Sequence, residues 1–278
     1  MSTCLVGSEM CIRDRLVGLL LLAPYRILLG AEQIPLYLPY QSSQFPELSV
    51  RFDAALNAAG LGQFVTETTD YWHPYQQGIR QGRPGVYLAA PHFVAWAHHR
   101  HQFIPVLRLS TPLQYVIATR HDDAQYFELR DLAEQNVCST RAVNLDFLLV
   151  KDAFKDTLKP AVNKIVNSVA SAMQYDNQNC AAFVVSEQAF KAFNTEDPQR
   201  FIRLYQGPEY RNYAFIAHPD IPRESAIQLK SFLRSAQAMA ILTPVLSQFA
   251  TKPKLIPVKR RDYPKTYLET LKPYWQAD

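Results

Sequence analysis

The chain has 278 residues, of which 48% are hydrophobic, so it can form one large domain or two medium-sized domains around a substantial core. Its formal net charge is only +4, and the basic residues are scattered without interleaved aromatic side chains, which argues against nucleic acid as a partner. The 19 prolines against 9 glycines suit a folded chain with stiff loops.

The first 31 residues need separate treatment. Cys4 to Arg15 resembles translated sequencing-adapter sequence, so we leave this segment and its two cysteines out of the fold argument. Leu16 to Ala23 is apolar but shorter than the about 20 residues that span a bilayer. It has the length of a signal-peptide core, and Gly30-Ala31 offers small residues for cleavage. We therefore expect export to the periplasm; the alternative is a buried N-terminal helix.

The first half of the remaining sequence alternates strands and helices. Gly60 is expected to terminate the first helix, and Pro91 suits the first turn of the third. The order β-α-β-α-β-α is typical of a parallel sheet. Hydrophobic spacing predicts strands at 34–40, 64–69 and 86–90, and helices at 48–59, from about 74, and from 91 onward.

The second half predicts a further α/β set and a return to the first. The chain leaves the first set near 114–120 and returns near 211–217. Two crossings make a hinge and a cleft that can close on a small ligand. Strands are predicted at 106–109, 114–120, 136–140, 181–185, 201–205 and 213–217, and helices at 145–154, from 160 through Met173, from about 223, from Thr243-Pro244 to 249, and along the stripe of Tyr263, Tyr267, Leu271 and Trp275.

Several short segments follow one another in a recognisable order: Asp70-Tyr71 followed by Gly85 and Ala-Pro-His-Phe93, the strand Gln114–Arg120 with Leu129-Arg-Asp-Leu132, Asn136-Val-Cys138, Cys180-Ala-Ala182, Pro219-Asp-Ile-Pro222, and Asp262-Tyr263 through Trp275. In this order they resemble the phosphonate-binding group of periplasmic ABC-transporter receptors. The resemblance runs from about residue 34 to the end, and it lies in the order and spacing of short pieces.

The resemblance implies an α/β, two-lobe periplasmic-binding-protein type II fold with two crossover strands that form a hinge. Residues 32–113 plus 214–278 would form lobe 1, and 114–213 lobe 2. The implied function is an exported solute-binding receptor that closes on a small polar ligand, with phosphonates and other oxyanions as candidates. The implied partners are that ligand and an ABC permease, with membrane contact only through the permease and a monomeric receptor.

Two departures bear on the ligand. Receptors of this family typically offer a Ser-Thr-Ser cluster at the start of the second-lobe helix, where hydroxyl and N–H groups hold the anion. This chain has Arg141-Ala-Val-Asn-Leu-Asp146 there, and Asp146 would repel an anion. Phe93 stands where the family often has a tyrosine. The resemblance therefore specifies the fold better than the ligand.

Candidate ligand-binding residues follow the predicted strands, because the carboxyl ends of strands in open α/β sheets collect ligands. His92 could donate to an anionic or carbonyl ligand or be a buried capping histidine, and Tyr71 and Trp72 could form cleft walls or pack in the core. Asn144 is expected to cap a helix first and contact ligand second. The complete set is Tyr40, Gln41, Ser42, Tyr71, Trp72, His92, Phe93, Thr140, Arg141, Asn144, Ser186 and Glu187, with Ser139 at the same strand end.

The remaining chemistry is sparse. In an exported protein Cys138 and Cys180 would form a disulfide; the alternative is two buried thiols. His98, His99 and His101 lack a metal-ligand spacing and fit a solvated basic face better. We find no G-x-S-x-G, H-E-x-x-H, P-loop or G-x-G-x-x-G motif, so we expect no metal, no cofactor and no enzymatic activity. The alternatives are a sensor domain that feeds a kinase or chemoreceptor, and an enzyme on the same scaffold.

Overall fold

The computed structural model describes residues 33–68, 72–122, 125–140, 143–157, 159–166, 169, 179–197, 200–259 and 261–275. The segment 1–31, for which a signal sequence is expected, lies outside these residues, as do the candidate site residues Tyr71 and Arg141. Among the described helices, none combines the length and the hydrophobicity that a membrane span requires.

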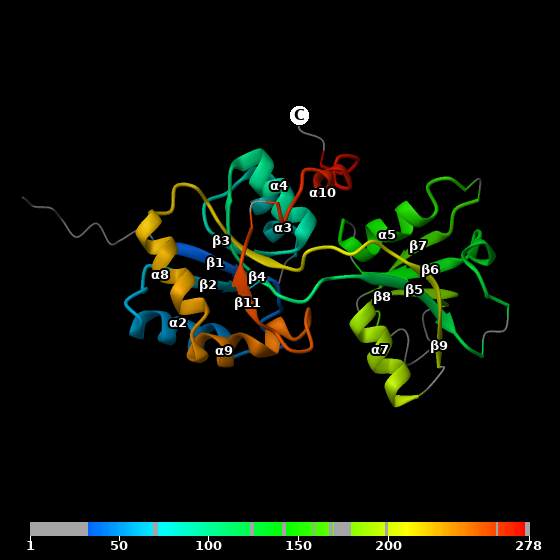
Figure 1. Cartoon of the computed structure of the whole chain (residues 1–278), viewed down its shortest axis with the longest axis horizontal. Helices are drawn as coiled ribbons and strands as arrows, with labels where there is room; N and C mark the ends of the chain where they lie inside the picture. The colour runs from blue at the N-terminus through cyan, green and yellow to red at the C-terminus, as the bar shows by residue number, and fades with distance from the viewer. Residues whose placement is uncertain are drawn as a thin grey trace, which may run out of the picture. The chain divides into compact units, whose positions relative to one another are not determined.

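The strands form two separate sheets (Figure 1). The first has six strands in the order β11-β4-β10-β3-β1-β2, and the second has five in the order β7-β6-β8-β5-β9. The first sheet contains β1 (Ile34–Leu38), β2 (Phe64–Thr68), β3 (Val86–Ala89), β4 (Ile104–Leu109), β10 (Ala214–Ala217) and β11 (Leu255–Pro257). The second contains β5 (Tyr115–Arg120), β6 (Asn136–Ser139), β7 (Val162–Ile165), β8 (Ala182–Ser186) and β9 (Phe201–Gln206).

The predicted parallel unit at the start of the chain is confirmed, because β1 pairs in parallel with both β2 and β3. β10 is inserted antiparallel between β3 and β4. In the second sheet β8 pairs in parallel with β6 and antiparallel with β5. The chain crosses between the sheets after β4 and returns before β10, and the two crossing segments pair with each other through Leu113 and Tyr210. This connectivity gives the predicted two-lobe fold with two crossover strands.

Helices cover both faces of the first sheet (Figure 1). One face packs against α2 (Leu48–Ala58), α8 (Arg223–Leu233) and α9 (Ala236–Leu246). The other packs against α3 (Trp72–Gln81), α4 (Pro91–His101) and the short α10 (Thr266–Glu269). β3 is buried along its whole length, since both of its faces are covered. Gly85 precedes it at φ 147°, and an added Cβ would lie 3.0 Å from the carbonyl oxygen of Pro35, so only glycine fits there.

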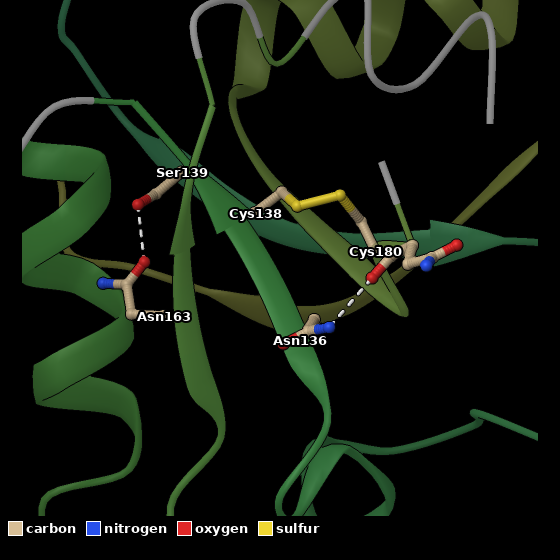
Figure 2. The surroundings of a disulfide bond; sticks show 6 residues. Asn136, Cys138, Ser139, Asn163 and Cys180 are labelled. Atoms are coloured by element: carbon tan, nitrogen blue, oxygen red, sulfur yellow. Dashed lines mark hydrogen bonds between the residues drawn. A yellow bond between two sulfur atoms is a disulfide. The ribbon is translucent and has the colours of Figure 1, made fainter. Parts of the chain in front are cut away.

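The second sheet is covered by α5 (Leu145–Ala153) on one face and α7 (Glu187–Glu196) on the other. A 3₁₀ turn, η1 (Leu129–Leu132), lies between β5 and β6. Figure 2 shows Cys138 of β6 bonded to Cys180, which lies just before β8; their Cα atoms are 5.7 Å apart. The Oγ of Ser139 donates to Oδ1 of Asn163 at 2.6 Å, so this hydroxyl ties β6 to β7 (Figure 2).

The structure differs from the predicted elements at three places between Pro160 and Leu246. The helix expected from Pro160 begins as β7, because Val162–Ile165 pairs in parallel with all of β6 and thereby gains a ladder of backbone hydrogen bonds. α7 is an additional helix that follows Ser186, whose hydroxyl accepts from the N–H of Ala189. The long helix from Arg223 breaks at Ser235, which caps α9 through the N–H of Ala238, so α9 runs on through Thr243 and Pro244.

The C-terminal stripe is wrong as a helix but holds as packing. Only Thr266–Glu269 is an α-helix, followed by turns to Tyr274. Tyr263, Leu271 and Trp275 are buried and Tyr267 is partly buried. All four belong to the core on the face of the first sheet that α3, α4 and α10 cover, which we call the second core of the first sheet.

Candidate functional site

His92 makes a direct contact between the two halves of the fold. It is the second residue of α4, and Pro91 at the first position directs its side chain from the end of β3. Its Nε2 lies 2.9 Å from the carbonyl oxygen of Val143, which precedes α5. The side chain is completely buried, and burial lowers the pKa of the imidazole to about 3, although the hydrogen bond to Val143 opposes this shift. The ring is therefore neutral at neutral pH.

The second nitrogen of His92, Nδ1, has no hydrogen-bond partner among the described residues. The ring of His92 lies 4.0 Å from that of Phe93, which stacks on Trp275 at 4.8 Å. Phe93 is 1% exposed and belongs to the core, so the structure uses its ring for packing. A buried acceptor without a partner beside an aromatic wall is an unusual arrangement and points to an unfilled polar contact.

The start of α5 faces this histidine through Val143. Asn144 occupies the predicted N-cap position, but its side chain makes no capping bond and instead donates to Oγ1 of Thr140 at 3.1 Å. Asp146 in the first turn of α5 accepts at Oδ2 from the N–H of Thr140 at 2.5 Å, so it ties the end of β6 to the helix. Burial raises the pKa of Asp146, while hydrogen bonds from Thr140 and the first turn of α5 counteract the rise.

Two tyrosines of the crossing segments belong to the same neighbourhood. Tyr115 begins β5 and Tyr213 precedes β10, and both side chains are partly exposed. Burial raises the pKa of both, and the negative charge of Asp146 raises them further. Sequence reasoning identified the crossings but missed these tyrosines. The available signal was a tyrosine at the edge of each crossing.

Ser186 and Glu187 lie in a different place. They line a cavity of about 430 Å³ that also takes in Thr111–Gln114, Gln188, Lys191, Glu209, Phe249 and Thr251. Ser186 caps α7, and Glu187 bonds Arg203 at 2.7 Å and Lys191 at 3.2 Å. Glu187 is therefore already neutralised by two cations of its own lobe.

The remaining candidates also divide. Tyr40 is 2% exposed in the core with α2 and α9, whereas Trp72 packs with Tyr75, 4.9 Å away, on the opposite face of the first sheet. Gln41 and Ser42 lie in the partly exposed loop after β1. The structure thus brings His92, Thr140 and Asn144 together and leaves Tyr40, Ser186 and Glu187 apart from them.

The histidines of α4 each bond a backbone carbonyl. His98 Nδ1 lies 2.8 Å from the oxygen of Phe103, His99 Nε2 3.1 Å from that of Tyr263, and His101 Nε2 2.7 Å from that of Arg80. These bonds hold α4 to its surroundings. In the described part of the chain no group of three or more histidine, cysteine or acidic residues could hold a metal ion.

A family model described as the periplasmic substrate-binding protein of a phosphonate ABC transporter matches residues 37–263. No protein with a curated function matches the sequence.

Solved structures share the fold at low identity. PhnD1 from Prochlorococcus marinus, in complex with methylphosphonate, has a TM-score of 0.67 at 11% identity and covers 88% of this chain and 98% of its own. XAC2383 from Xanthomonas citri, bound to ATP, has a TM-score of 0.64 at 13% identity and covers 88% of this chain and 97% of its own. A binding protein of an ABC phosphonate transporter from Pseudomonas aeruginosa has a TM-score of 0.60 at 13% identity and covers 87% of this chain and 86% of its own.

Proposed function

Because this chain belongs to the periplasmic substrate-binding family of phosphonate ABC transporters and is a solute-binding receptor, we propose that it binds a small polar ligand beside His92. The observation that carries the proposal is the bond from His92 to Val143, since it joins the end of β3 to the start of α5. The end of β3 and the strand end that precedes α5 are both carboxyl ends of parallel strands followed by helices. Polar ligands are bound at such positions in open α/β sheets.

The proposed contacts are His92, Thr140, Asn144, Tyr115 and Tyr213, with the predicted Tyr71 and Arg141 as further members. The Nδ1 of His92 is buried and has no hydrogen-bond partner among the described residues, and Tyr115 and Tyr213 lie close enough to Asp146 for its charge to raise their pKa. Buried polar groups normally find a partner, and a ligand can supply it. Tyr40, Gln41, Ser42, Trp72, Phe93, Ser186 and Glu187 are proposed as secondary contacts only.

We propose residues 32–113 plus 214–278 as one lobe and 114–213 as the other. The division is supported by the membership of the strands in two sheets and by the paired crossings at Leu113 and Tyr210. Crossing segments of this kind act as hinges, so ligand binding would close the lobes around the site.

The family implies a small-molecule ligand, an ABC permease as partner, and export. We propose further that the receptor is a monomer, that residues 1–31 contain a cleaved signal sequence, and that the bound solute leaves chemically unchanged. Light scattering coupled to gel filtration, N-terminal sequencing of the exported protein, and recovery of the intact ligand test these three points in turn.

The decisive experiment is a thermal-shift screen with amines, amides, polyols, phosphonates, phosphate and sulfonates, followed by calorimetry of each hit. A ligand present at a hundred times its dissociation constant should stabilise the protein by about 2.7 kcal/mol. We expect His92→Ala to weaken binding, whereas the control His121→Ala, an exposed histidine of the other lobe, should not. Equal affinities of the two variants would refute the proposed site.

A further inference from the structure

The imidazole of His92 is held in one tautomer. The carbonyl oxygen of Val143 can only accept, so the proton must be on Nε2, 2.9 Å away. In the neutral ring Nδ1 is then a lone-pair acceptor. This nitrogen is buried and has no donor among the described residues, and His92 is 0% exposed. The unpartnered group of this side chain, which was predicted as a donor, is therefore an acceptor.

The N-terminus of α5 is already occupied by a carboxylate of the chain itself. The first N–H groups of a helix and its dipole attract an anion. Here Asp146 takes that place: it accepts from the N–H of Thr140, from the Thr140 hydroxyl, and from the backbone of Asp146 and Phe147. Every one of these partners is a donor, and Asp146 is 3% exposed.

A dianionic ligand would meet two unfavourable neighbours here. Its oxygens would approach the lone pair of His92 Nδ1, and they would compete with Asp146 for the same N–H groups while lying beside its negative charge. A ligand with an N–H or O–H group would instead donate to Nδ1, and a positive charge would be attracted by Asp146.

From this juxtaposition of a buried His92 acceptor with the Asp146 carboxylate at the α5 N-terminus, we infer that the receptor selects a neutral or cationic ligand that donates a hydrogen bond to His92 Nδ1, and that it rejects dianions. This inference rests on the proposed function, because it assigns a ligand class to that same site. It also makes His92 a residue that determines specificity.

Two variants separate the contributions. His92→Gln places an amide N–H where Nε2 stands, so it can keep the bond to Val143, but it has no acceptor at the position of Nδ1. Asp146→Asn keeps the size of the side chain and removes its charge. The matched control is Asp152→Asn, an equal charge change at an exposed position near the other end of α5.

The test is calorimetry with methylphosphonate and inorganic phosphate on the wild type and on folded Asp146→Asn and Asp152→Asn. We expect no binding of either anion to the wild type at millimolar concentration. Asp146→Asn should gain affinity for methylphosphonate by about tenfold or more, because one charge is removed from the site. Asp152→Asn should not gain it.

Hits from the screen provide the second arm. An amine that binds the wild type should bind at least about tenfold more weakly once the amine is fully N-methylated, because methylation keeps its charge and removes its hydrogen-bond donors. The unmodified amine should likewise bind His92→Gln at least about tenfold more weakly than the wild type. Methylphosphonate binding to the wild type, no gain in Asp146→Asn, or an affinity unaffected by His92→Gln would each overturn the inference. If methylphosphonate binds the wild type and His92→Ala abolishes this, the ligand class is wrong while the proposed site stands. Binding that ignores His92→Ala refutes the site itself.

Discussion

Reduction of the Cys138–Cys180 disulfide should destabilise the second sheet by a predictable amount. The bond joins β6 to the residue before β8 across a sequence separation of 42 residues, so it constrains a loop of that size in the unfolded chain. The chain-entropy relation gives about 4 kcal/mol at 25 °C for a loop of this length. Both cysteines are buried among Val116, Val166 and Phe183, and as thiols they would remain well packed there, so the loss should come mainly from the unfolded state.

The three tryptophans allow the effect to be located. Trp96 and Trp275 lie in the second core of the first sheet and Trp72 packs against it, so indole fluorescence reports the first lobe, whereas far-UV circular dichroism reports both lobes. Urea titrations with and without reductant should show a loss of about 4 kcal/mol in the dichroism transition, and thermal melting should fall by roughly 10 °C. The double variant Cys138→Ala/Cys180→Ala should match the reduced protein.

Mutation of Cys4 and Cys11 to serine is the control and should leave the transition unchanged. The reasoning fails if mass spectrometry shows two alkylated thiols at Cys138 and Cys180 while the dichroism midpoint stays where it was. It also fails if the oxidised variant with Cys4 and Cys11 mutated to serine yields two free thiols, because the bond itself would then be absent.

Three further predictions concern single side chains. Asp262→Ala should lower the free energy of unfolding in urea by about 3–5 kcal/mol, because Arg108, 10% exposed and 2.9 Å from that carboxylate, would keep a buried unpaired charge. An equal loss in Lys272→Ala, which removes an exposed ion pair, would contradict this. Ser235→Ala should cost about 1 kcal/mol through the lost α9 cap, and Ser231→Ala, exposed within α8, much less. Since the pKa of His92 is lowered to about 3 in the folded protein, the unfolded chain takes up this proton first as the pH falls. The free energy of unfolding of the wild type should therefore fall by about 2 kcal/mol between pH 7 and 5, in addition to any fall seen in His92→Gln. Identical pH profiles of the two proteins would exclude a neutral buried His92.

The first sheet could be predicted because its signals are local. Apolar runs such as Val86–Ala90 mark buried strands, and Gly60 and Pro91 mark helix ends within one turn of the boundary. β7 failed because Val162, Ile165, Val166 and Val169 have helical spacing, yet pairing with β6 decides the conformation. That pairing joins residues 26 positions apart, and no local pattern encodes it.

α7 and the break at Ser235 could have been read from the sequence. Ser186 precedes Ala189, Phe190 and Phe193 at helical spacing, and Ser235 precedes a run that continues through Leu246; both serines accept a bond from the N–H three residues later. The N-cap preference of serine was the relevant signal in each case. At Thr243-Pro244 the proline draws attention as a breaker, but it lies in the last turns of α9, beyond the break that the serine makes.

The sequence pattern placed the candidate residues at strand ends, but it could not tell which side chains meet. Which face a residue joins depends on the direction of its side chain, and for this reason Tyr40 and Trp72 lie in different cores. The bond between His92 and Val143 spans 51 positions and uses a backbone oxygen, to which the amino-acid type at 143 gives no clue.

That bond also bears on how the receptor responds to ligand. It joins α4 to the segment before α5 through protein groups alone, and we propose that it stabilises the closed arrangement of the lobes without ligand. A ligand shifts a two-state equilibrium only by its differential affinity, and a higher closed fraction raises the apparent affinity in proportion. His92→Gln, which keeps this bond, and His92→Phe, which removes it, therefore separate the two roles of the residue. Loss of affinity in both variants assigns His92 to ligand binding, whereas loss in His92→Phe alone assigns it to closure.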